Sequence, residues 1–310
     1  MREFSQTELL LELEPVVAGE LDRHHKVAKE WFPHEYVPWS EGRDYDGLFG
    51  GDAWVETDSK LPEEARVSLI VNLLTEDNLP SYHYEIATAF GRDAAWGTWV
   101  HRWTAEEGRH GTAIRDYLTV TRAVDPVALE RARMSHMEEG FSNAYEGVLH
   151  SLAYVSFQEL ATRISHRNTG RASQDPNCER LLARIAADEN LHMLFYRNLL
   201  DAAFQLTPSQ TMRAVTDVVT TFQMPGTGIE GFTRKAMTIA NAGIYDLRLH
   251  IDDVLMPVLR QWAVFDMKDL DAEGEKAREE LAEFLARLEV SASRFVERRE
   301  ARRARQAATA

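Results

Sequence analysis

Trp-Thr-Ala-Glu-Glu-Gly-Arg-His at residues 103–110 and Ala-Ala-Asp-Glu-Asn-Leu-His at residues 186–192 both end in the pattern Glu-x-x-His. Residues three apart share one face of a helix, so Glu107 with His110 and Glu189 with His192 can each direct a carboxylate and an imidazole to one point. Of the 11 His residues, only these two have Glu three positions earlier. The spacing therefore suggests metal ligands.

Each pattern is preceded by a further glutamate, Glu76 or Glu159, at about the distance of one helix-turn-helix. Four helices that supply six ligands match the arrangement of ferritin-like di-iron and di-manganese bundles. The sequence thus predicts an all-α, ferritin-like four-helix bundle with a carboxylate-bridged centre of two metal ions and additional flanking helices. The candidate metal ligands are Glu76, Glu107, His110, Glu159, Glu189 and His192.

Carboxylate and imidazole ligands suit iron, manganese or zinc, and the lack of clustered cysteines argues against an iron–sulfur or structural zinc site. Four buried carboxylates without a metal would be costly, because like charges repel strongly in a low dielectric. The alternative is that some of these glutamates face solvent and that the repeat is accidental.

The 310 residues are 44% hydrophobic, enough for a sizeable core, and carry a net charge of −15. This charge argues against a nucleic-acid partner. The single Cys178 cannot form an internal disulfide, and the N-terminus lacks the apolar run of a signal peptide. No segment approaches the length of a transmembrane helix. We expect a cytoplasmic protein.

Apolar spacing predicts a helix over residues 7–31, broken or kinked at Pro15, because proline lacks an amide hydrogen. After Pro15, Arg23, Lys26 and Lys29 are three residues apart on one face. They form either a solvated charged face, as is common on surface helices, or a docking stripe for an acidic carrier.

Residues 32–61 are rich in Pro and Gly and are expected to be irregular, and no segment shows the sustained alternation of a strand. One domain over residues 1–310 is the economical interpretation, with the metal-binding bundle at about 62–206 and flanking helices at about 208–305. The expected helices run from Pro62 to Glu76 with a new turn or kink at Pro80, over 94–120 with Asp93 as cap, from Pro126, over 145–165, over 178–206, from Pro208, over 232–262 with a kink at Pro257, and over 272–305.

Longer motifs surround the candidate ligands. They are Thr-Glu-Asp-Asn-Leu-Pro at 75–80, the stretch at 103–110, Ser-Phe-Gln-Glu-Leu-Ala-Thr-Arg-Ile-Ser-His at 156–166 and Ala-Asp-Glu-Asn-Leu-His at 187–192. Together with Leu-Asp-Ala-Glu-Gly-Glu-Lys-Ala at 270–277, they resemble the soluble acyl-[acyl-carrier-protein] desaturases, the stearoyl-ACP desaturase family. The resemblance covers nearly the whole chain.

This resemblance implies a role for individual residues. Asp188 resembles a carboxylate that orients a ligand histidine. Thr162 resembles the family's active-site threonine near the oxygen-binding face, although a helix threonine can also bond its own backbone. Trp31 resembles a surface tryptophan on the electron route through Asp188 and His110, with a packed aromatic as the alternative. The implied ligands of two iron ions are Glu107 and Glu189 as bridges, Glu76 with His110 on one ion, and Glu159 with His192 on the other.

The resemblance also implies an O2-dependent enzyme that inserts a cis double bond into an acyl chain bound to acyl carrier protein. Ferredoxin or a similar donor would supply electrons, and a homodimer is implied. Two alternatives are another di-iron or Mn/Fe oxygenase that hydroxylates a carrier- or CoA-bound acyl chain, and a non-catalytic ferritin-like metal-binding protein. Residues 80–91 resemble a helix that lines the acyl tunnel, but they carry His83 and Glu85, which leaves chain length and double-bond position open.

Overall fold

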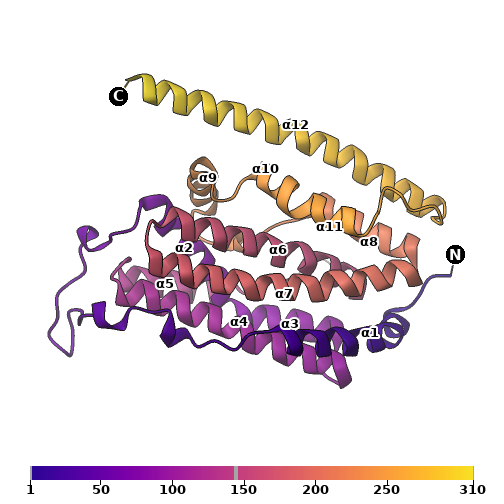
Figure 1. Ribbon diagram of the computed structural model, residues 1–310, viewed down its shortest axis with the longest axis horizontal. Coiled ribbons are helices and arrows are strands. Elements are labelled where there is room, and N and C mark those ends of the chain that lie inside the picture. Colours follow the sequence, from indigo (N-terminus) through magenta and orange to yellow (C-terminus); the bar gives the residue numbers. More distant parts are fainter. Residues whose placement is uncertain (1, 143–145, 310) are drawn as a thin grey trace.

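A computed structural model describes residues 2–142 and 146–309 and is helical throughout, the only β feature in this part being an isolated bridge between Tyr45 and Asp52. Four helices form a bundle at the centre of the molecule (Figure 1). This confirms the predicted all-α class. The bundle helices are α2 (Glu63–Asp77), α4 (Ala94–Val120), α6 (Val148–Ala172) and α7 (Pro176–Leu206).

The remaining helices cover the bundle. They are α1 (Gln6–Val27) against α4 and α7, α3 (Leu79–Phe90) against α4, α5 (Pro126–Glu139) and α9 (Phe232–Ala242) against α2, α8 (Pro208–Thr221) against α6 and α7, and α12 (Ala272–Thr309) against α8. Figure 1 shows α12 along one side of the molecule, with its C-terminal end extending beyond the bundle. Shorter elements are η1 (Pro33–Glu35), η2 (Trp39–Glu41), η3 (Glu56–Asp58), η4 (Pro225–Gly228), α10 (Leu247–Leu249), η5 (His250–Leu255) and α11 (Met256–Gln261).

Large aromatic side chains fill the interior of the bundle. Trp99 stacks on Phe195 with ring centroids 3.5 Å apart, and Phe157 and Tyr196 are also fully buried. Burying a side chain of this size contributes roughly 2 to 3 kcal/mol. This core can offset the cost of placing charged residues beside it.

The prediction of a break at Pro15 is wrong, because α1 continues through it. Proline removes one hydrogen bond, to the carbonyl of Leu11, and Leu11 is 68% exposed, so that carbonyl lies on the solvated side of the helix. The helix ends at Val27. Lys29 therefore lies beyond it, and the predicted single helical face for Arg23, Lys26 and Lys29 is wrong at its last member.

Asp93 occupies the predicted cap position of α4, but its side chain makes no capping hydrogen bond. Instead, the Glu14 carboxylate of α1 accepts a hydrogen bond from the amide of Ala95 at 2.7 Å. A residue from another helix thus satisfies this helix end, which local sequence signals cannot reveal.

The single helix predicted over 232–262 is also wrong. Gly243 ends α9 with a φ of +81°, a left-handed conformation that glycine adopts at little cost. Asp246 then caps the next helix, and Pro257 lies in the first turn of α11 after the π-helical segment η5. The predicted start of α6 near residue 145 lies outside the described residues, and the helix runs on to Ala172 rather than ending near 165.

No helix in the described parts of the chain is both long enough and apolar enough to cross a membrane.

Candidate metal centre

The six predicted side chains converge inside the bundle, and all are buried. They form two groups of four whose candidate ligand atoms lie within 4.8 Å of one another. Glu107 and Glu189 belong to both groups. Glu76 and His110 complete one group, and Glu159 and His192 complete the other.

Both histidines turn Nδ1 toward the carboxylates. Nδ1 of His110 lies 3.2 Å from a carboxylate oxygen of Glu107 and 3.2 Å from one of Glu189. Nδ1 of His192 lies 2.7 Å from Glu107 Oε1 and 3.5 Å from Glu159 Oε2. Each histidine therefore faces two carboxylates, and at least one of them belongs to both groups.

Several polar atoms at this centre have no hydrogen-bond partner among the described residues: Glu107 Oε1, Glu159 Oε2, Glu189 Oε1 and His192 Nδ1. Buried polar atoms in folded proteins are rarely left unpaired. His192 Nδ1 and Glu107 Oε1 lie 2.7 Å apart but without hydrogen-bond geometry, and the candidate ligand atoms of each group converge within 4.8 Å, so they fit metal ions.

The ionisation of the same groups leads to the same conclusion. Burial and the negative charge of Glu189 raise the pKa of both Glu107 and Glu159. Burial opposes protonation of His110 and His192, but the adjacent carboxylates raise the pKa of both well above the usual range. Bound cations would replace those protons and stabilise the carboxylates. The two clusters can therefore hold metal.

Asp188 lies behind His110, as its predicted role requires. His110 Nε2 is 3.4 Å from Asp188 Oδ2, which also accepts a hydrogen bond from Trp31 Nε1 at 2.7 Å. Arg184 forms an ion pair with the other oxygen of Asp188. Burial would raise the pKa of Asp188, but hydrogen bonds from His110 and Trp31 lower it below the usual range. Trp31 stacks on the His110 ring and is only 3% exposed, so it is a packed aromatic and the expectation of a surface tryptophan is wrong.

Glu106 occupies the matching position behind His192, and the sequence analysis missed it. Its carboxylate lies 2.9 Å from His192 Nε2 and 2.9 Å from His24 Nε2. Although burial opposes ionisation, hydrogen bonds from these two histidines lower the pKa of Glu106 far below its usual range. A signal was present, because an acidic residue directly precedes the glutamate in both motifs, Glu106 before Glu107 and Asp188 before Glu189.

Two more residues hold the outer oxygens of candidate ligands. His166 Nε2 lies 2.9 Å from Glu76 Oε1, and Trp103 Nε1 donates to Glu159 Oε1 at 2.8 Å. Both belong to the motifs quoted above, but no spacing rule distinguishes them from ordinary core residues.

Thr162 lies beside the clusters and lines the cavity next to them. Its hydroxyl is 2.9 Å from Glu189 Oε2 and 3.0 Å from the backbone carbonyl of Glu159. The hydroxyl hydrogen can therefore be donated either to the Glu189 carboxylate or to the helix backbone.

A mainly apolar cavity reaches the clusters from one side. Its lining includes Glu76, Glu107 and Thr162, together with Tyr82 and Glu85 of α3. The buried hydroxyl of Tyr82 has no partner among the described residues. His83 does not line this cavity.

The cavity continues toward the surface. Phe141, Tyr154 and Pro225 line both this cavity and a neighbouring one, whose lining includes the exposed residues Glu139 and Thr227. We call the first space the apolar cavity and this surface end its mouth.

The predicted docking residues lie elsewhere. Arg23 is paired with Glu20 at 2.6 Å, Lys26 is exposed near the end of α1, and Lys29 lines a groove that shares no lining residue with the apolar cavity.

A helical bundle with two overlapping carboxylate and histidine clusters beside an apolar cavity defines a class of metal-binding proteins. The chain matches the family "Fatty acid desaturase" over residues 5–310. It belongs to that family.

Relatives agree with this assignment. The chain is 52% identical over 296 residues to a putative acyl-[acyl-carrier-protein] desaturase, DesA1, of Mycobacterium tuberculosis, covering 93% of this chain and 87% of the relative. It is 31% identical over 299 residues to a chloroplastic stearoyl-[acyl-carrier-protein] 9-desaturase of Oryza sativa, covering 89% and 74%. The X-ray structure of the putative acyl-ACP desaturase DesA2 from M. tuberculosis matches with a TM-score of 0.67 at 31% identity, over 82% of this chain and 98% of that one.

Proposed function

We propose that this protein is an O2-dependent di-iron acyl-[acyl-carrier-protein] desaturase, which introduces a cis double bond into a carrier-bound acyl chain. The observation that carries the proposal is the pair of overlapping carboxylate and histidine clusters at the inner end of an apolar cavity. Relatives in this family carry names that specify stearoyl and palmitoyl chains on acyl carrier protein.

In this proposal Glu107 and Glu189, which belong to both clusters, would each help to hold two iron ions. Glu76 and His110 would complete one site, and Glu159 and His192 would complete the other. The iron pair, when bound, would supply the activation of O2 that removal of two hydrogens from an unactivated methylene pair requires.

The protein's own contribution is to position the chain and exclude water. Glu76, Glu107 and Thr162 line the cavity and would lie beside an acyl chain threaded from the mouth. Thr162 would hold Glu189 through its hydroxyl on the side of the clusters that faces the cavity. Glu85, the carboxylate that α3 contributes to the cavity lining, would disfavour methylene groups at its level, because an ionised group is costly to desolvate.

Asp188 and Glu106 act from behind the clusters. Each accepts from the outer nitrogen of one histidine, so Nδ1 remains directed at the metal position. We place Trp31 on the electron route through Asp188 and His110, with ferredoxin or a similar protein as donor. A homodimer in the cytoplasm completes the proposal, and Arg23, Lys26 and Lys29 remain a predicted docking surface for the carrier.

Mass spectrometry of the acyl chain after turnover tests the proposal. The iron-loaded protein is incubated with a panel of acyl carrier proteins bearing different chains, together with ferredoxin, its reductase and O2. Loss of two hydrogens is the expected result and would identify the preferred chain. Gain of one oxygen would identify a hydroxylase instead. An unchanged chain across the panel, from protein of full iron content, would reject the desaturase assignment.

A further inference from the structure

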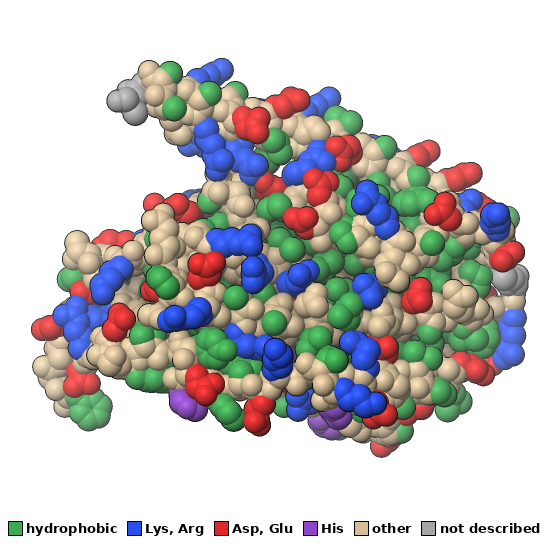
Figure 2. All heavy atoms as spheres, in the orientation of Figure 1, with side chains coloured by type: hydrophobic (Ala, Val, Ile, Leu, Met, Phe, Trp, Pro, Cys, Tyr) green, Lys and Arg blue, Asp and Glu red, His purple; other side chains and the backbone are tan. Residues whose placement is uncertain are grey.

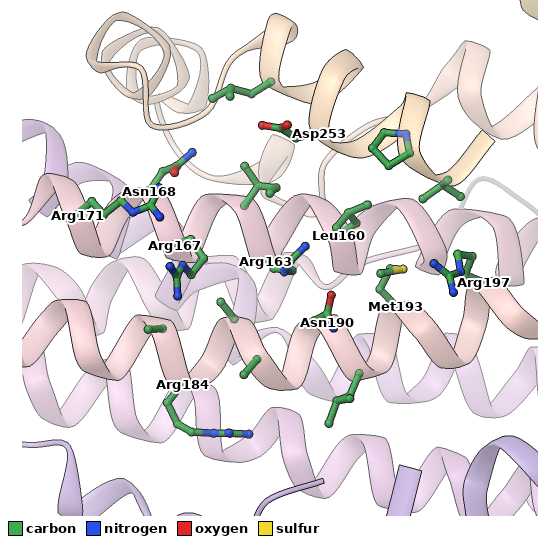
Figure 3. A pocket seen from close by; sticks show the side chains of 18 of the residues that line it. Leu160, Arg163, Arg167, Asn168, Arg171, Arg184, Asn190, Met193, Arg197 and Asp253 are labelled. Atoms are coloured by element: carbon green, nitrogen blue, oxygen red, sulfur yellow. The ribbon is translucent and has the colours of Figure 1, made fainter. Parts of the chain in front are cut away.

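A strongly basic groove runs between α6, α7 and the η5–α11 segment, with a volume of about 1040 Å³ (Figure 3). It is lined by six cationic side chains and one carboxylate, Asp253, on a chain whose net charge is −15. We call it the basic groove. Its cations are Lys29, Arg163, Arg167, Arg171, Arg184 and Arg197.

Three of these cations form a stripe on α6. Arg163, Arg167 and Arg171 are four residues apart, so they lie on one face with a rise of about 6 Å between neighbours. Like charges at this spacing destabilise a helix. Within the described residues none of the three makes a hydrogen bond or a close ion pair, and burial together with the charge of Arg167 lowers the pKa of Arg163. The stripe is thus a cationic surface with little internal compensation.

The space-filling view shows Lys and Arg side chains gathered over α6 and α7 in the middle of this face (Figure 2). Apolar side chains lie between them, among them Leu160, Ile164 and Met193. Cations around an apolar floor suit a protein surface that presents carboxylates, since charge steers the encounter and apolar contact holds it.

One end of the basic groove reaches the side chains that pack behind the candidate metal ligand His110. Arg184 lines the groove, pairs with Asp188, and holds its guanidinium 5.8 Å from the centre of the Trp31 ring. Asp188 in turn contacts His110 and Trp31. A partner seated on Arg184 would therefore be separated from a candidate metal ligand by two side chains.

From this geometry we propose that the basic groove is the docking surface of an acidic electron-donor protein. This inference rests on the proposed function. The donor would be oxidised by one electron per encounter and the metal centre reduced by one, with no bond made or broken. The acyl carrier is the less suitable occupant, because the groove shares no lining residue with the apolar cavity or its mouth. Lys29, which belongs to the predicted carrier stripe, would then contact the electron donor instead.

The test uses the full-length, iron-loaded protein and a plant-type [2Fe–2S] ferredoxin as the probe. The variant Arg163→Gln/Arg167→Gln/Arg171→Gln should bind ferredoxin at least about tenfold more weakly at low ionic strength, and its affinity should depend less on salt. The matched control, Arg294→Gln/Arg298→Gln/Arg302→Gln, removes three charges at the same spacing from exposed positions of α12 and should bind as the wild type does.

Reduction of the iron centre provides a second measurement. In the groove variant, reduction by ferredoxin should slow, whereas reduction by dithionite should match the wild type. The single variant Arg167→Glu, at an exposed position, should also weaken binding. Because it changes only one surface residue, it shows whether the effect of the triple variant could come from misfolding.

Four results would overturn the inference: no binding of ferredoxin to the wild type, equal binding to the groove variant, a loss of acyl-carrier binding in its place, or a changed oligomeric mass that shows an interface between copies. If no double bond forms but ferredoxin binding still requires the groove, docking stands and the desaturase proposal fails.

Discussion

The two halves of the metal centre come from one repeated motif, yet their surroundings differ. On the His110 half, Asp188 connects the histidine to Trp31 and Arg184, and so to the basic groove. On the His192 half, the matching carboxylate Glu106 contacts the buried His24, whose ring packs edge-on against Trp99, and its other oxygen pairs with Arg102 of the same helix.

This difference shows what the motif does and does not specify. The acidic residue before each glutamate supports a histidine on both halves. The next layer comes from other parts of the chain: α1 brings His24 to one half, and the segment after α1 brings Trp31 to the other. We therefore expect the halves to respond alike to loss of their metal ligands and differently to loss of the outer residues.

The largest effect is expected from the shared ligands. Glu107→Ala should abolish binding of both metal ions, because Glu107 belongs to both clusters. His192→Ala should also lose metal, and metal content by elemental mass spectrometry measures both variants. Glu138→Ala, at an exposed position of α5, is the control. Full metal retention in both Glu107→Ala and His192→Ala would reject the ligand assignment.

The carboxylates behind the histidines should have an intermediate effect. Asp188→Asn and Glu106→Gln should each weaken metal affinity about 10- to 100-fold, because each histidine loses a charged acceptor that directs its ring. Competition with a chelator of known affinity measures this. Similar losses would show that the halves are equivalent at this level, whereas an unchanged affinity for Glu106→Gln would remove Glu106 from the site.

Electron transfer should separate the halves. Trp31→Phe removes the hydrogen bond to Asp188 and should slow reduction by ferredoxin by about tenfold without changing metal content. Stopped-flow spectroscopy of the iron centre measures the rate. Trp54→Phe is the control, because the Trp54 indole donates to the backbone carbonyl of Arg122 and not to Asp188. The iron centre of this variant should be reduced at the wild-type rate. A normal rate in Trp31→Phe would exclude this residue from the route.

The smallest effect is on acid stability of the metal-free protein. A carboxylate whose pKa is lowered by folding stabilises the protein above its unfolded pKa, about 4.3 for Glu, and this contribution disappears as pH falls through the folded value. Glu106→Gln should therefore cost about 2 kcal/mol of unfolding free energy at pH 7, and this difference from the wild type should shrink below about pH 4.

Denaturant titrations at several pH values measure the loss, and Asp188→Asn should follow the same direction because folding also lowers the pKa of Asp188. A difference that grows as the pH falls would contradict the assignment of these carboxylates as ionised in the folded protein.

Much of the fold was predictable because its signals are local. The helix at 94–120 was placed to the residue, and Asp125 accepts hydrogen bonds from the first amides of α5 as its position before Pro126 predicts. The errors arose where a distant residue or a backbone conformation decides. Glu14 satisfies the start of α4 from α1, and Gly243 ends a helix that its apolar neighbours would extend.

The same limit applies to the site. The pair Glu107 and His110 was identifiable because both lie on one helix at fixed spacing, and the structure brings all six predicted side chains together. His24 could not be foreseen, since its contact with Glu106 joins residues far apart in the sequence.

The sequence by itself determined the helical class and the two Glu-x-x-His pairs, because helical periodicity fixes which residues share a face, and the match to a known bundle arrangement added Glu76 and Glu159. Only the tertiary structure decided that one half of the centre leads through Asp188 and Arg184 to a cationic groove, while His24 packs behind the other half. Those contacts depend on how separate helices pack, and packing depends on the shapes and charges of side chains that no local pattern relates.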